Sequence, residues 1–352
     1  MTLFTPLQLG NVLLRNRIVV SPMCQYSAVD GVPNDWHLVH LGSRAVGGAG
    51  LVFTEATAVS AEGRISPGDT GIWNDAQQAA WTRITEFVRA QGAAVGIQLA
   101  HAGRKGSTEV PWRGGKALAA DAMPWVPVAP SAIAFADGYP QPAALDDAGI
   151  QKVIADFVAA ARRARAAGFE VIELHAAHGY LVHEFLSPLS NTRGDRYGGS
   201  LSNRAHLLRA IVSAVRTEWP APRPLFVRVS ATDWVDGGWD IDECVTLARW
   251  LKSDGVDLID VSSGGNAAHA KIAVGPGYQV PFASRIRRDA AIGTGAVGLI
   301  TDAHQAQKIL LDGNADLIIM ARETLRDPYF PRRAAKELGA TIEAPIQYQR
   351  AW

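Results

Sequence analysis

The sequence is short of cysteine, of net charge and of long apolar runs, and each shortage excludes a class of protein. Only two of its 352 residues are cysteines, Cys24 and Cys244, and they form no Cys-x-x-Cys pair. We therefore expect no disulfide framework, no cysteine-rich zinc site and no cysteine-ligated iron–sulfur cluster. Basic and acidic residues balance at 34 each, so we expect neither nucleic acid nor an anionic membrane as a partner.

Targeting and membrane signals are also missing. The first six residues, Met1 to Pro6, lack the basic region and apolar core of a signal peptide. No apolar run reaches the roughly 18 residues that a bilayer-spanning helix needs. We therefore expect a cytoplasmic protein, and an apolar share of 48% is enough to bury a substantial core.

What the sequence does contain is a recurring unit, in which an amphipathic stretch and a small-residue turn precede a short apolar strand. The eight candidate strands are 18–20, 51–55, 95–99, 171–175, 225–230, 258–262, 295–297 and 317–321. The helix-like segments between them include 75–91, 146–167, 200–217, 240–254 and 301–312. We interpret Asp146, Asp240 and Thr301 as N-caps. Strands that alternate with helices predict parallel βα units, and eight units predict an α/β protein folded as a (β/α)8 TIM barrel. A doubly wound open sheet is the alternative.

Residues 1–352 are expected to form a single domain, because no linker or low-complexity tract divides them. The segment before Ile18, around Leu9 to Val12, is predicted to be a hairpin that closes the bottom of the barrel. Long βα loops after the third, fourth and sixth strands, at 102–145, 176–199 and 263–281, are predicted to form lids or pocket walls.

The last two strand ends carry the features of an anion site. Gly298 follows the seventh strand and Ala321-Arg322 follows the eighth, so backbone amides and one guanidinium are expected to form a phosphate cup there. The run from Gly293 to Gly298 also matches Gly-x-Gly-x-x-Gly. Too little chain follows it to build a dinucleotide-binding domain, so we reject that interpretation. A flexible turn remains the structural alternative.

Two further features stay open on the residues alone. His175 and His178 end the fourth strand, where they could bind a metal, pack in the core or hold one substrate oxygen between two N–H groups. His101 and His183 are near enough to keep the metal open, but no carboxylate motif of a zinc hydrolase accompanies them; we expect no metal. Arg228 lies late in an apolar strand and needs a partner, since an unpaired buried guanidinium is costly. A structural ion pair would satisfy it.

Taken in order, the strand-end motifs resemble the Old Yellow Enzyme family. The motifs are Ser21-Pro-Met-Cys-Gln-Tyr26, Glu55-Ala-Thr-Ala58, Gln98-Leu-Ala-His-Ala-Gly-Arg-Lys105, His175-Ala-Ala-His-Gly-Tyr180 and Arg193-x-Asp-x-Tyr-Gly-Gly-Ser200. Cys24, the His-x-x-His pair and the ending Gln347-Tyr-Gln-Arg-Ala-Trp352 resemble the bacterial, thermophilic-like branch of that family. The resemblance runs from about Leu3 to Trp352 without a large gap.

The resemblance implies an enzyme with non-covalently bound FMN and with NADPH as the reductant. The implied reaction reduces the activated C=C bond of α,β-unsaturated carbonyls, imides or nitroalkenes, by ping-pong hydride transfer through flavin N5. The implied partners are small molecules and further copies of the chain, in a homodimer or homotetramer. In this branch the residue that matches Arg350 reaches the active site of a neighbouring subunit; on the residues alone Arg350 is a solvated tail residue.

The resemblance also implies a role for each matching residue in holding the cofactor. Arg228 would lie beside the N1–C2 edge of the flavin and stabilise the negative charge of its reduced form. Cys24 would touch the flavin and tune its potential; a small buried hydrophobic residue is the alternative. The remaining implied cofactor residues are Ser21, Pro22 and Met23 along the flavin wall, Ala56 and Gln98 at the pyrimidine ring, and Gly298, Ala321 and Arg322 at the phosphate.

For the substrate, the resemblance implies that His175 and His178 bind the carbonyl oxygen and that Tyr180 donates a proton to the α-carbon. Solvent could replace Tyr180 as the donor. Tyr26 would be a second hydrogen-bond donor of the pocket. Ordinary packing with a satisfied hydroxyl is the structural alternative for both tyrosines.

Several other functions remain possible for a flavin or phosphate-binding barrel. A dienoyl-CoA reductase would need a cysteine cluster and an added domain, and a tRNA dihydrouridine synthase would need an RNA-binding extension. A lyase or isomerase without flavin could use the phosphate cup for a sugar phosphate. A flavin-binding protein without catalytic activity is the last alternative.

Overall fold

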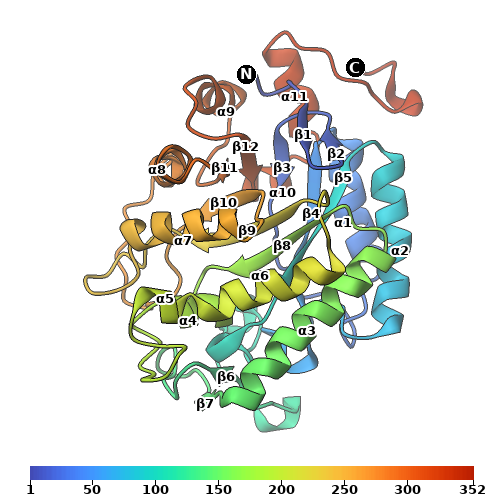
Figure 1. The fold of residues 1–352 in the computed structure, drawn as a ribbon. Coiled ribbons are helices and arrows are strands. Elements are labelled where there is room, and N and C mark those ends of the chain that lie inside the picture. The colour runs from blue at the N-terminus through green and yellow to red at the C-terminus, as the bar shows by residue number, and fades with distance from the viewer.

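Eight parallel strands close into a barrel in the computed structural model, which describes residues 1–352 (Figure 1). Their order around the barrel is the order along the chain, and the last strand pairs with the first. The strands are β3 (Ile18–Val20), β4 (Leu51–Ala58), β5 (Ala94–Ala100), β8 (Val171–Ala176), β9 (Leu225–Ser230), β10 (Leu258–Ser262), β11 (Gly293–Ala296) and β12 (Leu317–Met320). The predicted (β/α)8 barrel is confirmed, and the open-sheet alternative is excluded because the sheet has no free edge.

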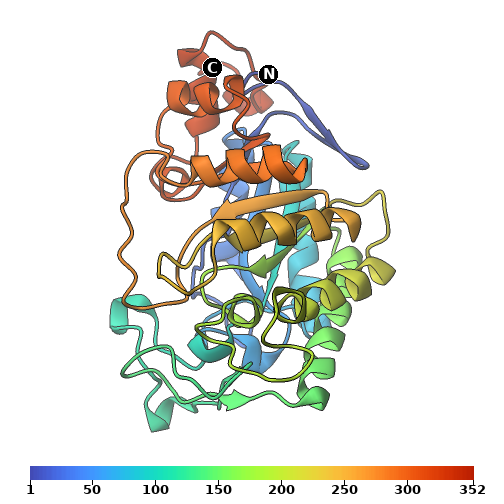
Figure 2. The ribbon, with the colours of Figure 1, turned by 60° about the vertical axis from the view of Figure 1, so that its left-hand side comes forward.

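Helices surround the barrel and cover the outer faces of the strands (Figures 1 and 2). The longer ones are α1 (Asp35–Val46), α2 (Asp75–Ala90), α3 (Asp147–Ala166), α6 (His206–Glu218), α7 (Ile241–Ser253), α8 (Val280–Ala290), α9 (Ala303–Leu311) and α11 (Phe330–Glu337). The shorter ones are α4 (Leu181–Leu186), α5 (Leu201–Arg204) and α10 (Arg322–Arg326). None of the helices combines the length and apolar character needed to cross a membrane.

Side-chain caps set where several helices begin. The predicted N-caps Asp146 and Asp240 are confirmed, since each side chain accepts hydrogen bonds from backbone amides of the first turn. The prediction of Thr301 as an N-cap is wrong. Asp302 caps α9 instead by accepting from the amide of Gln305 at 2.7 Å, while the Thr301 amide donates to the Gln305 side chain. The expected single helix over 200–217 is also divided into α5 and α6, which meet at Ala205.

The predicted N-terminal hairpin is present as β1 (Leu7–Leu9) and β2 (Val12–Leu14), which pair antiparallel. Val12 and Leu14 belong to a buried apolar cluster with the inward side chains at the lower ends of the barrel strands, including Leu51 and Leu258. This cluster closes the N-terminal mouth of the barrel. The loop strands β6 (Val128–Ala129) and β7 (Ala143–Ala144) lie at the opposite end, far from the hairpin and both chain termini (Figures 1 and 2).

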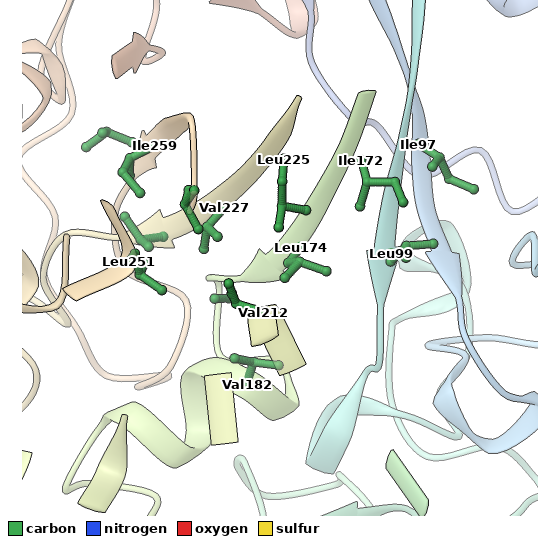
Figure 3. Close-up of a cluster of buried hydrophobic side chains, with 14 of the residues drawn as sticks. Ile97, Leu99, Ile172, Leu174, Val182, Val212, Leu225, Val227, Leu251 and Ile259 are labelled. Atoms are coloured by element: carbon green, nitrogen blue, oxygen red, sulfur yellow. The ribbon is translucent and has the colours of Figure 1, made fainter. Parts of the chain in front are cut away.

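Side chains alternate between two directions along each strand. One set packs in the core between the strands and the helices, and the other set points into the barrel. Ile172 and Leu174 of β8 point outward and pack in the large core between strands and helices (Figure 3). Val171 points inward into the apolar cluster above the hairpin. With a side-chain period of two, Glu173 and His175 share the inward face with Val171. Charged and polar side chains therefore occupy the C-terminal end of the barrel interior, and the apolar cluster with Val12 and Leu14 occupies the N-terminal end.

Candidate active site

Arg228 belongs to the layer of buried polar side chains at the C-terminal end of the barrel, which we call the floor. It is buried on β9, in register with His175 of β8 and Asp260 of β10. Its Nη1 donates to the Ser21 hydroxyl at 3.0 Å, and its Nε lies 3.2 Å from a carboxylate oxygen of Asp260. The ion pair that the sequence left open is therefore present. It holds the guanidinium in place, with Ser21 at the end of β3.

Ala56 and Gln98 lie together on the neighbouring strands. The two residues are partners in the β4–β5 register, just after a bulge in β4. The Gln98 amide Nε2 donates to Glu173 at 2.8 Å, and both residues are buried. This contact orients the Gln98 amide, as a ligand contact at this position would require.

His175, His178 and Tyr180 form an aromatic cluster beside this floor. The His175 ring lies 5.2 Å from the His178 ring and 5.0 Å from the Tyr180 ring, edge-on in both cases. His175 Nδ1 is buried without a hydrogen-bond partner in the protein. His178 adopts a left-handed backbone conformation with φ 60°, and its Nε2 lies 2.7 Å from the Ser262 hydroxyl. A backbone held in this region is strained, which is common where a side chain is aimed at a ligand.

Both imidazoles are neutral at ordinary pH. Burial, followed by the positive charge of Arg228, lowers the pKa of His175 and of His178 well below the usual range. A neutral imidazole carries one N–H. Each histidine can therefore donate one hydrogen bond, and the hydrogen bonds on the other ring nitrogens decide which nitrogen donates.

Lys105 and Ser262 contact this cluster, and neither residue was predicted to have a role. The Lys105 ammonium donates to the backbone oxygen of His178 at 2.7 Å and lies 5.4 Å from the Tyr180 ring centre. Burial lowers the pKa of Lys105 to about 7. In the sequence, Lys105 ends the 98–105 motif and Ser262 ends a strand. Neither position indicates what the side chain contacts.

The wall that follows β3 is held by Glu55. The Glu55 carboxylate accepts from the amide of Gln25 at 2.8 Å and lies 3.1 Å from Nε2 of His37 on α1. These contacts fix the loop that carries Cys24 and Tyr26, along with Pro22 and Met23. Burial, then the nearby Asp69 carboxylate, raises the pKa of the Cys24 thiol well above its usual value. The thiol is therefore protonated, unlike the thiolate of a nucleophilic cysteine.

The last two strand ends meet at a cavity of about 150 Å³. Gly298, Ala321 and Arg322, the three predicted phosphate residues, all line it, together with Ser262 from β10. Gly298 has φ 122°, and a Cβ there would lie 3.1 Å from the Gln279 amide. The cavity thus combines glycine backbone with an arginine, which fits the phosphate of a flavin mononucleotide.

Arg350 is not part of this group. It is exposed in the C-terminal tail, where Trp352 stacks on Tyr329 with ring centres 6.4 Å apart. The tail lies at the hairpin end of the barrel (Figure 1). A cavity of about 530 Å³ at that end, between Arg15 and residues 341–345, contains none of the predicted site residues.

His183 has a structural role, which weakens the metal alternative. Its Nδ1 accepts from the amide of Gly179 at 2.9 Å, and its Nε2 lies 3.1 Å from Asp233, with both side chains fully buried. No group of three or more His, Cys, Asp or Glu side chains has the arrangement of a metal site. His175 and His178 therefore lack the further ligands that a metal would need.

A closed βα barrel with a cavity after its last two strands, and with Arg228 and Gln98 at the C-terminal ends of its strands, is compatible with a flavin-binding barrel oxidoreductase. Residues 2–340 match the model of the NADH:flavin oxidoreductase / NADH oxidase family. The chain belongs to this family, which is the Old Yellow Enzyme family.

Individual relatives agree over the whole chain. The chain is 52% identical to an NADPH dehydrogenase of Listeria innocua and 50% identical to one of Bacillus subtilis, in each case over 99% of both chains. Among solved structures, morphinone reductase in complex with tetrahydroNAD superposes with a TM-score of 0.78 at 32% identity, covering 98% of this chain and 93% of the other. The protein is an FMN-linked NADPH oxidoreductase, as predicted, and the flavin-free lyase or isomerase is excluded.

Proposed function

We propose that this protein reduces the activated C=C bond of α,β-unsaturated carbonyls, imides and nitroalkenes at the expense of NADPH, in a ping-pong cycle, and that residues 1–352 form one FMN-binding domain. The observation that carries this proposal is the pair of neutral imidazoles of His175 and His178, which lie edge-on to each other, with His175 in register with the buried Arg228. Two neutral N–H donors next to a flavin floor suit a substrate oxygen that gains negative charge during the reaction. FMN held by these floor and wall residues would supply the hydride-transfer chemistry that links NADPH oxidation to reduction of the β-carbon of the alkene through flavin N5.

The cofactor residues divide by the part of FMN that each would hold. Gln98, Ala56 and Arg228 would face the pyrimidine ring, and the Arg228 charge would stabilise the reduced form. Ser21, Pro22, Met23 and Cys24 would line the ring system along the wall that Glu55 holds. Gly298, Ala321 and Arg322 would bind the phosphate.

The two histidines would bind the substrate oxygen and stabilise the charge that develops on it. His175 is buried, and its Nδ1 has no protein partner. His178 would donate from Nδ1 when its Nε2 accepts from the Ser262 hydroxyl, which lies 2.7 Å away. Binding one oxygen between two fixed donors also orients the alkene, which accounts for part of the catalysis.

Tyr180 would then give a proton to the α-carbon. Burial raises the pKa of Tyr180 well above its usual value, so the phenol stays protonated and can act as an acid. Tyr26, whose pKa is also raised mainly by burial, would be a second donor of the pocket.

Arg350 would act only across a subunit interface. Within one chain it lies at the hairpin end of the barrel, so a role in binding substrate requires a homodimer or homotetramer in which the tail of one subunit reaches the pocket of another. The exposed tail residues Ile346 and Trp352 are compatible with such a contact.

Anaerobic titration of the holoenzyme with NADPH, followed by addition of cyclohexenone, tests the proposal. We expect bleaching of the flavin absorbance by NADPH and its return on addition of the enone. Steady-state rates at several fixed enone concentrations should give parallel double-reciprocal lines. Intersecting lines would contradict the ping-pong cycle, and a bleached flavin that the enone does not reoxidise would contradict the substrate class.

A further inference from the structure

We propose that Glu173 and Asp260 form a carboxyl pair that holds a single proton beside Arg228 and Gln98, with Glu173 as the neutral acid and Asp260 as the carboxylate that balances Arg228. This goes beyond the proposed function, and it rests on the placement of Arg228 and Gln98 against the flavin. It assigns these two buried side chains a positioning and charge-setting role toward the cofactor.

The barrel register places each carboxyl beside one residue of the floor, since Asp260 pairs with Arg228 and Glu173 pairs with Gln98. Glu173 on β8 and Asp260 on β10 lie on either side of β9, which carries Arg228, and both are fully buried. Asp260 lies 3.2 Å from the Arg228 Nε, and Glu173 accepts from the Gln98 amide at 2.8 Å. Each carboxyl therefore supports one of the two side chains proposed to face the flavin pyrimidine ring.

On the side of the N-terminal mouth, no charged side chain compensates the negative charge of the two carboxyls. The neighbouring inward side chains are Phe53 and Phe226, whose rings lie 6.0 Å apart, and Ile319, all within the apolar cluster above the hairpin. From above, the groups that face the pair are Arg228, Gln98 and the neutral His175. Two carboxyls thus share one cation in a dry interior.

A charge count then requires one proton. Two carboxylates beside a single guanidinium would leave one buried negative charge uncompensated, and such a group takes up a proton instead. One oxygen of Glu173 and both oxygens of Asp260 have no conventional hydrogen-bond partner. A proton on the unpartnered Glu173 oxygen would provide a donor for Asp260 and reduce this deficit.

The environments of the two carboxyls decide which one is the acid. Burial, followed by the negative charge of Asp260, raises the pKa of Glu173 well above its usual value. Burial also raises the pKa of Asp260, but the adjacent Arg228 opposes that rise. Glu173 is therefore the acid. Arg228 and Asp260 together are nearly neutral, so the flavin faces only part of the guanidinium charge.

The flavin reduction potential distinguishes this arrangement from a purely structural pair. In Glu173→Gln the amide replaces the neutral acid and Asp260 keeps its charge. In Asp260→Asn the remaining Glu173 ionises beside Arg228. Each single variant retains one negative charge, so its potential should stay near that of the wild type. Only the double variant leaves Arg228 uncompensated. Its ratio of reduced to oxidised flavin, measured against a reference dye, should rise on the order of tenfold to a hundredfold.

Infrared difference spectra of the holoenzyme provide the second readout. Wild type minus Glu173→Gln should show the carbonyl stretch of a protonated carboxylic acid, and wild type minus Asp260→Asn should show the same band. Glu184, a buried carboxyl whose pKa is raised to about 8, cancels in these differences, and Glu184→Gln identifies its separate band.

The proposal is overturned if Glu173→Gln leaves the acid band in place, if either single variant shifts the potential as far as the double variant does, or if the double variant has the potential of the wild type. FMN content and the midpoint of thermal unfolding show whether each variant is folded. None of these measurements uses an alkene, so the proposed substrate class can fail without affecting this result.

Discussion

His178 Nε2, in the loop that follows β8, lies 2.7 Å from the hydroxyl oxygen of Ser262 at the end of β10, with β9 between the two strands. Because His178 is neutral, this hydrogen bond determines which of its nitrogens carries the proton. If the Ser262 hydroxyl donates to Nε2, the proton is on Nδ1 and can point to a substrate oxygen. Ser262 is therefore expected to set the tautomer of His178.

Replacing Ser262 by alanine should weaken the binding of a phenol such as p-hydroxybenzaldehyde by about tenfold, because the donor nitrogen is no longer defined. FMN should stay bound, and Ser262→Thr should restore binding by keeping the hydroxyl. Ser263→Ala is the matched control, since the Ser263 hydroxyl donates to Gln279 at 2.6 Å and not to a histidine. Titration of the flavin absorbance with the phenol measures each case. Wild-type affinity in Ser262→Ala would refute the role.

Replacing His175 and His178 together by alanine should lower kcat/KM for cyclohexenone by at least about a hundredfold, since two donors to the developing charge are lost. The FMN content should be unchanged. Phenol binding by the wild type should not weaken as the pH falls through the usual histidine range, because both pKa values lie well below it. His304→Ala on the exposed face of α9 is the control. Unaltered turnover in the double variant would remove both histidines from the mechanism.

Replacing Tyr180 by phenylalanine should slow reoxidation by the enone by about ten- to a hundredfold while leaving reduction by NADPH unaffected. The reason is that only the second half-reaction needs a proton on carbon. Anaerobic stopped-flow absorbance measures the two half-reactions separately. Tyr329→Phe, at the tail end of the barrel, is the control. Equal rates of reoxidation in wild type and Tyr180→Phe would identify solvent as the proton donor.

Replacing Gly298 by alanine should raise the dissociation constant of FMN by about tenfold or more. Its φ of 122° disfavours a side chain, and the added methyl group would press on Gln279 at the phosphate cup. Gly313→Ala is the matched control: Gly313 also has a positive φ, of 73°, but no atom lies within 4 Å of its Cβ position. Fluorescence of released FMN during dilution measures the affinity. Equal losses in both variants would show that backbone strain alone, and not the cup, is responsible.

Replacing Asp233 by asparagine should destabilise the fold by about 3 kcal/mol, because the buried His183 loses its charged partner. Burial alone would raise the pKa of Asp233, but His183 and the hydrogen bonds from Ser187 and Trp239 lower it to about 2. A carboxyl with a lowered pKa stabilises the fold above its unfolded pKa, near 3.9, and this contribution is lost as the pH falls towards 2.

Acid unfolding followed by circular dichroism tests this dependence. The wild type should lose about 2 kcal/mol between pH 4 and pH 2 that Asp233→Asn does not lose. Asp236→Asn, in the exposed part of the same loop, should behave as the wild type. Identical acid profiles for wild type and Asp233→Asn would contradict the lowered pKa.

The barrel could be predicted because each strand has an apolar run and a small-residue turn, which are local signals. Helix α1 and helix α8 were not predicted. Helix α1 includes a glycine, which is unfavourable inside a helix. Helix α8 begins at Val280, near the end of the expected loop 263–281. Thr301 was preferred to Asp302 as a cap because both residue types cap helices, and only the geometry of the first turn decides between them.

Motifs at the strand ends predicted which residues belong to the site. They did not predict the contacts between these residues. Ser262 and His178 are 84 residues apart, and Glu173 meets Gln98 across 75 residues. Such pairs depend on the register of neighbouring strands, which a single sequence does not specify. Charged residues inside apolar strands, such as Glu173 and Asp260, were the local sign that a buried network exists.

The apolar cluster of the hairpin and the lower barrel closes the N-terminal mouth of the barrel. On the proposed cycle, NADPH, alkene and their products would therefore all use the C-terminal mouth, the end at which the loop with β6 and β7 lies. Each product would have to leave by the route through which the next reactant enters. An excess of alkene would then compete with NADPH for the pocket, and the turnover rate would fall as the alkene concentration rises.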